Sequence, residues 1–153
     1  MGLVKSNFDP ELLAVRLAQL GDRSSRKILG VMRDEAETIA TLAKENAPHK
    51  DGDLEGAIEV VEDRGGVNNR TQVTIQVNPA ATDAHGKRVA EYAAIMHEGL
   101  APYGTGAFQL DEGSIAKDGG SGKVGGKFME RAVRSRLGPM GKKVKAIISE
   151  ESK

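Results

Sequence analysis

The clearest pattern in the chain lies before residue 48, where apolar positions recur at helical spacing. Steps of three or four separate the members of one apolar stripe: Ile28, Met32, Ala36, Ile39 and Ala43. This spacing predicts an amphipathic helix over residues 24–46. Pro48 ends it, because proline lacks the N–H that a helix interior requires. An earlier helix is predicted to begin near Asp9, which precedes a proline suited to a first helical turn, and to end at Gly21.

Two segments with the pattern of strands follow, at residues 57–62 and 71–77. In the second, Val73, Ile75 and Val77 alternate with polar residues, so one face is apolar and the other polar. Glycine and asparagine residues between positions 65 and 69 supply turn chemistry. The two segments therefore predict an antiparallel hairpin with one face buried and one face in water.

The remainder of the chain combines a glycine-rich stretch with another helical stripe. Residues 89–97 favour a short segment that is either helix or strand, and the pattern leaves both open. Nine of the nineteen glycines lie between positions 99 and 126, which predicts a long glycine-rich loop or arm. A last helix is predicted from about Lys127, with Gly138 and Pro139 breaking or kinking it.

This order of elements predicts a single α+β domain over residues 1–153. N-terminal helices and a C-terminal helix are expected to pack on one face of a small antiparallel sheet. Residues 1–8 are expected to form a flexible N-terminus. The residues expected to be largely buried are Ile39, Leu42, Val73, Ile75, Tyr92 and Phe128.

Composition and charge narrow the functional classes. The chain has no cysteine, which excludes disulfides, thiolate metal sites and cysteine nucleophiles. No apolar run approaches the roughly 20 residues of a membrane span, and the N-terminus lacks the apolar centre of a signal peptide, so a soluble protein without a membrane partner is expected. Net charge is zero, but residues 34–63 carry ten acids against two lysines and residues 117–145 carry nine bases against two acids.

The segregated charges leave two interpretations open. They form two solvated faces, or the acidic part of one subunit contacts the basic part of the next, as in head-to-tail contacts that close into rings. In the second case the candidate inter-subunit residues are Glu59, Glu62, Arg131 and Arg134.

No pattern of catalytic, cofactor-binding or metal-binding residues stands out. In the glycine-rich stretch before Lys127, Ser121 stands where a phosphate loop needs glycine, and Phe128 stands where it needs Ser or Thr. His97-Glu98 begins like a zinc-protease motif, but Ala101 occupies the place of the second histidine. We therefore expect neither an enzyme nor a cofactor.

Three short stretches, taken in order, carry a family pattern. In residues 43–58 the matching positions follow a helix that ends in Ala-Pro: Pro48, Gly52, Leu54 and Ile58, with Asp51 in place of a usual Thr and Ala57 in place of Ser. Tyr92, Ala93 and Gly99 match a Tyr-Ala followed by Glu-x-Gly, although His97 occupies the usual Glu position and Glu98 is shifted by one. Phe128 and Ala132 match a Pro-Phe-x-x-Pro-Ala pattern from which both prolines are absent.

These stretches resemble the tail-completion, or head–tail joining, proteins of long-tailed bacteriophages. The resemblance implies a structural virion protein, made in the host cytoplasm, that forms a sixfold homo-oligomeric ring in the neck. Its partners would be the head-completion or connector protein and the tail terminator or tail tube protein, with genomic DNA passing through the lumen without sequence-specific binding. The tail terminator ring of the same neck is an alternative.

The residues themselves fit a structural role. Gly52 permits a turn of positive φ, Leu54 and Ile58 anchor a strand, and Tyr92 and Phe128 are expected to pack over the sheet. Within residues 99–126, the large apolar residues are spaced as anchors for an arm laid against a neighbouring protomer: Tyr103, Phe108, Leu110 and Ile115. A passive loop is the alternative for this segment.

A DNA-binding protein is the rival from another class. Its basis is a basic surface on the C-terminal helix, formed by Lys123, Lys127, Arg131, Arg134, Arg136, Lys142, Lys143 and Lys145. The interleaved aromatic residues of single-strand binders are missing, and the net charge is zero.

Overall fold

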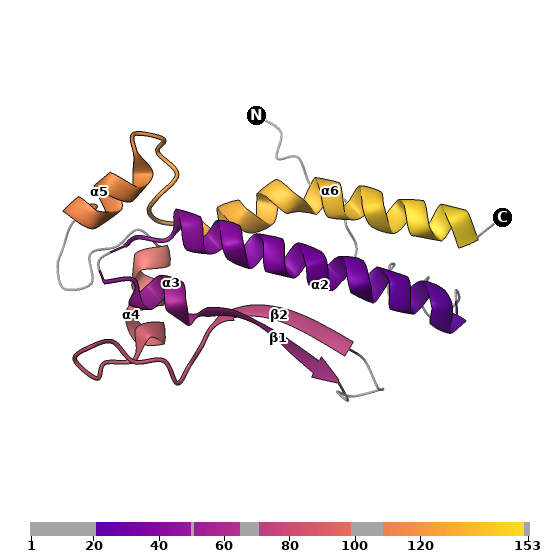
Figure 1. Ribbon diagram of the computed structural model, residues 1–153, viewed down its shortest axis with the longest axis horizontal. Helices are drawn as coiled ribbons and strands as arrows, with labels where there is room; N and C mark the ends of the chain where they lie inside the picture. The colour runs from indigo at the N-terminus through magenta and orange to yellow at the C-terminus, as the bar shows by residue number, and fades with distance from the viewer. Residues whose placement is uncertain (1–20, 50, 65–70, 99–108, 152–153) are drawn as a thin grey trace.

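The computed structural model describes residues 21–49, 51–64, 71–98 and 109–151 of the chain. The elements in order are α2 (Gly21–Asn46), α3 (Asp53–Ala57), β1 (Ile58–Arg64), β2 (Thr71–Val77), α4 (Val89–His97), α5 (Glu112–Asp118) and α6 (Phe128–Glu151). Helices α2 and α6 run side by side along an elongated molecule, and the β1–β2 hairpin lies along α2 (Figure 1). The three short helices gather at one end. The α+β prediction is confirmed.

The hairpin is antiparallel, and its register runs from Ile58 opposite Val77 to Arg64 opposite Thr71. Alternation places Ile58 and Val60 on the same face as Ile75 and Val77, and all four contribute to the core around α2. Only Ile58 among them is fully buried, because a sheet of two strands is covered by few elements. Leu42, Val73, Ile75 and Tyr92 are likewise only partly buried, whereas Ile39 and Phe128 are buried as expected.

The core is built largely from alanine and a few larger apolar side chains. Its buried members are Ile39, Ala40, Ala43, Ala47, Leu54, Ala57, Ile58, Val89, Ala93, Phe128 and Ala132. Small side chains on α2 and α6 allow these two helices to pack side by side. Among the described residues, Phe128 is the largest side chain that is fully buried, and it belongs to this core.

Several predicted boundaries hold and others are wrong. The long helix, the second strand and residues 89–97 are confirmed as α2, β2 and α4. Gly21, expected to end an earlier helix, lies instead within α2, and residues 1–20 lie outside the described residues. Ala57, expected in a strand, ends α3, a helix of five residues that is too short to show a period.

The last helix continues through Gly138 and Pro139, where a break or kink was expected. Proline disfavours helical backbone in the preceding residue partly through that residue's Cβ. Gly138 has no Cβ, so the predicted break is wrong. Among the described helices, none has the length and apolar character needed to cross a membrane.

Candidate functional site

The three stretches that carry the family resemblance meet in one core. Leu54 and Ile58 from the first, Ala93 from the second, and Phe128 and Ala132 from the third are all buried in the same cluster. Pro48 is buried directly after α2. Gly52 has φ of +83°, the left-handed conformation expected of it. Tyr92 packs against the cluster while partly exposed, and Gly99 lies outside the described residues.

Polar contacts join the second stretch to the third. The backbone N–H of Lys127 donates to the carbonyl oxygen of His97 at 2.5 Å, and Lys127 Nζ lies 2.6 Å from Glu98 Oε2. The hydrogen bond from Lys127 lowers the pKa of Glu98. The His97 ring meets the Phe128 ring edge-on, with centroids 5.2 Å apart. His97 and Glu98 therefore close the end of α4 onto α6.

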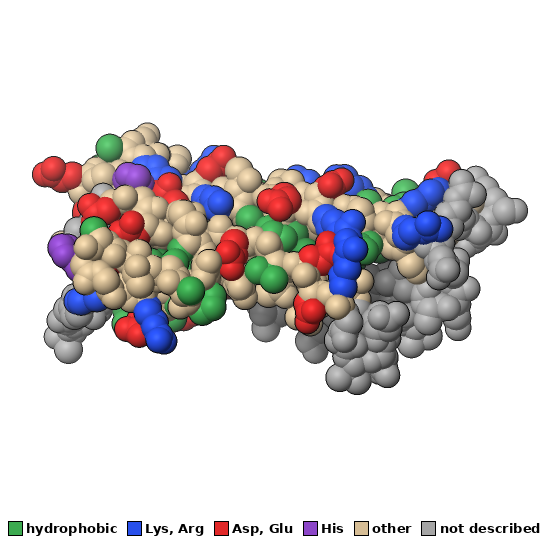
Figure 2. All heavy atoms as spheres, turned by 60° about the horizontal axis from the view of Figure 1, so that its bottom comes forward, with side chains coloured by type: hydrophobic (Ala, Val, Ile, Leu, Met, Phe, Trp, Pro, Cys, Tyr) green, Lys and Arg blue, Asp and Glu red, His purple; other side chains and the backbone are tan. Residues whose placement is uncertain are grey.

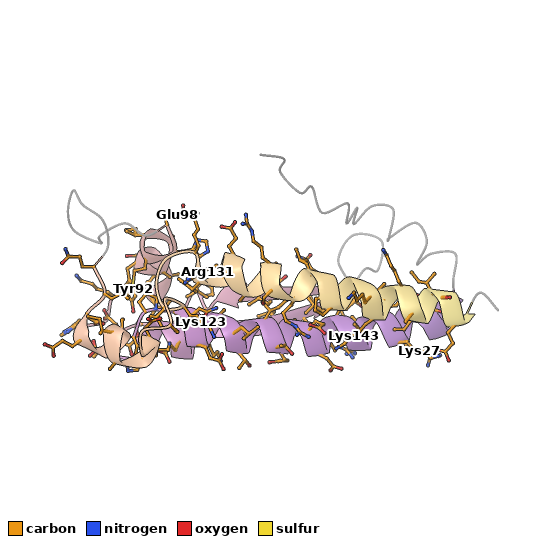
Figure 3. All side chains as sticks on the ribbon, turned by 90° about the horizontal axis from the view of Figure 1, so that it is seen from above. Lys27, Tyr92, Glu98, Lys123, Arg131 and Lys143 are labelled. Carbon is orange, nitrogen blue, oxygen red and sulfur yellow. The ribbon has the colours of Figure 1, made fainter. Side chains whose placement is uncertain are left out.

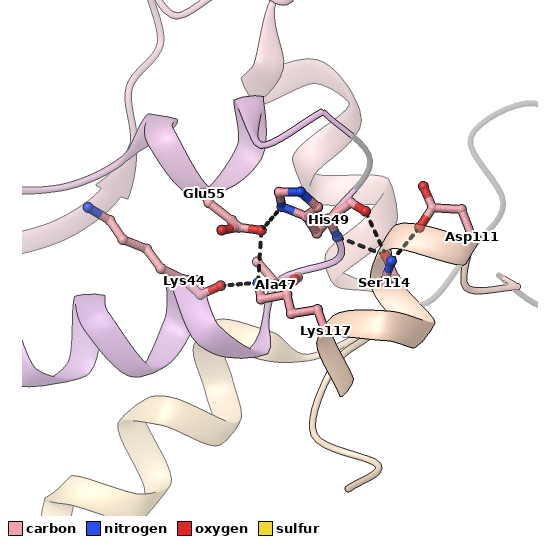
Figure 4. Close-up of polar contacts among 7 residues, drawn as sticks. All are labelled: Lys44, Ala47, His49, Glu55, Asp111, Ser114 and Lys117. Carbon is pink, nitrogen blue, oxygen red and sulfur yellow. Dashed lines mark hydrogen bonds and ion pairs between the residues drawn. The ribbon is translucent and has the colours of Figure 1, made fainter. Parts of the chain in front are cut away.

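The C-terminus of α2 is closed by the glycine-rich segment. Lys117 Nζ donates to the carbonyl oxygens of Lys44 at 2.5 Å and Ala47 at 2.8 Å, and it pairs with Glu55 Oε1 at 2.9 Å (Figure 4). The backbone N–H of Gly125 donates to Asn46 O at 3.0 Å. A helix leaves its last carbonyl groups without partners, and a basic side chain is well suited to them. Residues far along the chain thus supply the cap that α2 needs.

Helix α5 docks on the same turn. Asp111 caps α5 by accepting from the backbone N–H of Ser114 at 2.8 Å, and the Ser114 hydroxyl accepts from the backbone N–H of His49 at 2.8 Å. A Cβ on Gly113 would lie 2.6 Å from His49 O, so only glycine fits there. Residues 112–118 are therefore helical, and the expectation of a loop or arm over 99–126 is wrong for this part. Its other part, residues 99–108, lies outside the described residues.

The arrangement of Ser114 and His49 is not that of a nucleophile and its base. The hydroxyl bonds the backbone of His49, while the Nδ1 of the ring lies 2.5 Å from Glu55 Oε1. The ring and the hydroxyl therefore serve different partners. Their geometry supports a structural function for this cluster.

Asp118 organises the turn that follows α5. Its carboxylate accepts from the backbone N–H groups of Gly122, Lys123 and Val124, at 2.7–2.8 Å. These backbone bonds, led by that of Val124, hold its pKa at about 2. Such N–H groups are the donors that a phosphate loop would offer to its ligand. Here the protein's own carboxylate occupies them.

All four charged residues predicted at a subunit interface have partners within the chain, and two of them join separate segments of the fold. Arg33 on α2 donates to both carboxylate oxygens of Glu62, at 2.5 and 2.7 Å. Hydrogen bonds from Arg33 and then Arg64 hold the pKa of Glu62 at about 2. Arg131 donates to the carbonyl oxygens of Gly122 and Gly125. Glu62 and Arg131 therefore stabilise the protomer's own fold.

The other two charged candidates pair with residues of the hairpin or of their own helix. Glu59 accepts from the side chains of Gln76 and Asn78 on the outer face of the hairpin. Arg134, with a side chain 75% exposed, pairs with Glu130 one helical turn away. Tyr103 and Phe108 lie outside the described residues.

A buried ion network joins α2 to α6. Glu35 is 1% exposed and accepts from Arg136 Nε at 2.8 Å, Arg136 Nη2 at 3.0 Å and Lys143 Nζ at 2.6 Å. The hydrogen bond from Arg136, followed by that from Lys143, holds the pKa of Glu35 at about 2. Part of the acidic region therefore meets the basic region inside one protomer.

A pocket of about 440 Å³ opens at the end of the molecule where the short helices gather. Its apolar wall includes Pro48, Leu54 and Met96. Four aspartates also line it: Asp51, Asp53, Asp83 and Asp111. Its other polar residues include Lys87, His85 and Tyr92. Desolvation raises the pKa of Tyr92, and the charges of Asp53, Asp83 and Asp51 raise it further. The pocket is thus a site of negative potential.

Comparison with protein-family models, curated proteins and solved structures finds no match for the chain.

The acidic side chains of the pocket are candidate metal ligands and hydrogen-bond acceptors. Across the described ranges, no three His, Asp or Glu side chains are placed to hold a metal ion. Asp83 accepts the backbone N–H groups of Lys87 and His85, which lower its pKa, and Asp111 caps α5. Asp51, which is exposed, and Asp53, which is partly buried, also line the pocket, and no hydrogen bond or ion pair between described residues engages their carboxylates.

Proposed function

We propose that the chain is a structural subunit of the ring that joins the tail to the head in a long-tailed bacteriophage. The observation that carries this proposal is the meeting of the three motif stretches in a single core. Residues 43–58, 92–99 and 126–132 are distant in the sequence, yet Leu54, Ala93 and Phe128 pack together. Residues that serve a shared fold, and not a shared reaction, are expected to behave in this way.

The polar contacts support a structural function over a catalytic one. Lys117, Ser114 and Asp118 each hydrogen-bond backbone groups of the protomer. These bonds close helix ends and turns, so the side chains that would be first candidates for chemistry are already engaged. In the proposed function the subunit is not an enzyme and uses no cofactor.

The shape and the charge distribution support assembly into a ring. The molecule is elongated (Figure 2). The acidic pocket lies beside the short helices, whereas the exposed Lys142 and Lys145 lie in the C-terminal half of α6. In the proposed neck the ring is sixfold, lies between the head-completion protein and the tail terminator or tail tube, and surrounds the DNA. The terminator ring itself is the second position in the same structure.

A DNA-binding function is the competing proposal, and one observation favours it. Lys142 and Lys145 are exposed on one face of α6, as a phosphate-binding surface requires. Two other members of the basic set, Arg136 and Lys143, contact Glu35 instead. Because the carboxylate of Glu35 offsets part of their positive charge, the DNA-binding proposal is weakened.

Native mass spectrometry of the purified protein, with metal analysis and negative-stain imaging of the same sample, tests the proposal. We expect closed rings of several chains without stoichiometric metal. A duplex-DNA titration at two salt concentrations should find only weak, salt-sensitive binding. A particle of one chain at every concentration, stoichiometric zinc, or tight binding of a DNA site by a dimer would each refute a neck ring.

A further inference from the structure

We propose that the acidic pocket binds Lys142 and Lys145 from helix α6 of a second copy of this chain. This inference rests on the proposed ring and deepens it, because it names the surfaces through which neighbouring subunits join. The receptor is the pocket beside α3, and the inserted element is the exposed lysine face of α6.

The chemistry of the pocket suits an ammonium group on a carbon chain. Four aspartates against one lysine give it an excess of negative charge, and its apolar wall can cover the methylene groups of a lysine. Its volume of about 440 Å³ is sufficient for more than one side chain. Tyr92 lines the same pocket, and an aromatic ring face attracts a cation.

The two lysines suit this pocket in turn. Lys142 and Lys145 are exposed and lie three residues apart, so they share one face of α6. Among the ion pairs within the described residues, Lys143 is held by Glu35, while neither Lys142 nor Lys145 has an acidic partner. The neighbouring Gly138 is also exposed, and its lack of a side chain allows close approach to the helix.

The positions of the two surfaces point to a second copy as the occupant. Tyr92 marks the pocket end, whereas Lys143 lies well along α6 towards the other end (Figure 3). Complementary surfaces at separate places on one molecule cannot satisfy each other within that molecule. Contacts of this heterologous kind join subunits head to tail, and they close into a ring when the rotation between subunits permits.

Charge reversal provides the test. The pocket-reversed variant carries Asp51→Lys and Asp53→Lys, and the helix-reversed variant carries Lys142→Glu and Lys145→Glu. Each should weaken self-association by about tenfold or more, because like charges then face each other. Asp83 and Asp111 stay unchanged, since they hold the backbone of their own loops.

Rescue distinguishes a direct contact from a general effect of charge. An equimolar mixture of the two variants should assemble again, because each carries the surface that complements the other. The chain with all four substitutions should also assemble alone. A matched control for the pocket-reversed variant, Glu37→Lys with Asp63→Lys, makes the same change in net charge at exposed positions outside the pocket. It should assemble like the unmodified protein.

Sedimentation velocity measures association, and circular dichroism checks that each variant is folded. If a reversed variant is unfolded, a neutral variant replaces it. The neutral pocket variant carries Asp51→Asn and Asp53→Asn, and the neutral helix variant carries Lys142→Gln and Lys145→Gln. Each should also weaken self-association. Rings that persist in both variants, or variants that stay apart when mixed, would overturn this contact while leaving the neck ring standing. A helix-reversed variant that loses only DNA affinity would overturn it in favour of DNA as the occupant. A strictly monomeric unmodified protein would overturn both proposals.

Discussion

Replacing Arg136 with methionine should destabilise the protomer by about 2–3 kcal/mol. Glu35 is 1% exposed and loses two of its three hydrogen bonds in this variant, while Lys143 keeps the third. Removing one partner of a buried ion pair typically costs about 3–5 kcal/mol. We expect a cost below this typical range because Lys143 remains, and because the Arg136 side chain is itself 27% exposed.

The pH dependence gives a second estimate of the same quantity. The pKa of Glu35 is lowered from 4.5 to about 2 by Arg136 and then Lys143. A carboxyl with a depressed pKa stabilises the fold fully above its unfolded value, and this contribution is lost as the pH falls from 4.5 towards 2. The difference corresponds to about 3 kcal/mol at most, and partial exposure of the bases reduces it.

Urea unfolding followed by circular dichroism, at pH 7 and at steps down to pH 2.5, measures both effects. Arg136→Met should flatten the loss of stability in acid as well as lower the stability at pH 7. Arg134→Met is the matched control, since that arginine forms an exposed pair with Glu130. It should cost under about 0.5 kcal/mol. Unfolding of the two variants at the same urea concentration would refute a stabilising contribution from the Glu35–Arg136 pair.

Three further changes test other parts of the fold. Phe128→Ala should cost about 3–5 kcal/mol of unfolding free energy in urea, because a fully buried aromatic side chain leaves a cavity; near-unchanged stability would mean that the third motif stretch is not part of the core. Gly113→Ala places a Cβ 2.6 Å from His49 O, so hydrogen exchange across residues 109–118 should accelerate, whereas Gly56→Ala, where a Cβ meets open space, should leave these rates unchanged. Asp118→Ala should open the turn after α5 to protease cleavage at pH 7, and the unmodified turn should open only as the pH falls from 3.8 towards 2, because its carboxylate is held at a pKa of about 2; equal cleavage of both forms at pH 7 would contradict this.

Long periodic elements were predictable, whereas the two shortest helices, α3 and α5, were not. The stripe of α2 runs from Ile28 to Ala43, about four helical turns, and β2 alternates over seven residues. Helix α5 has seven residues, and its one large apolar side chain, Ile115, is 58% exposed. The sequence of α5 therefore has no buried apolar stripe from which a helical period could be recognised. The one local signal was Asp111, an acid in the position of a helix cap.

The charged residues of the candidate site were harder to assign, although signals were present. Glu62 falls two residues after Val60 in β1, so alternation places it on the inner face, where Arg33 meets it. Glu35 falls within the apolar stripe of α2, and Arg136 within that of α6. A charge at a core position calls for a buried partner of opposite sign. Which partner it finds depends on how two helices distant in the sequence pack together, and a single chain's pattern does not contain that information.

The closure of α2 by Lys117 and Gly125 has a consequence for how the protein is made. Lys117 follows Lys44 by 73 residues, and a ribosome needs about 4–15 s to add that many. During this interval the nascent helix ends in bare carbonyl groups, and the cluster that Phe128 completes has not yet been synthesised. Productive folding must therefore wait until most of the chain has emerged. A chain truncated before residue 109 should behave as an aggregation-prone intermediate, recognised by chaperones, and not as a smaller stable domain.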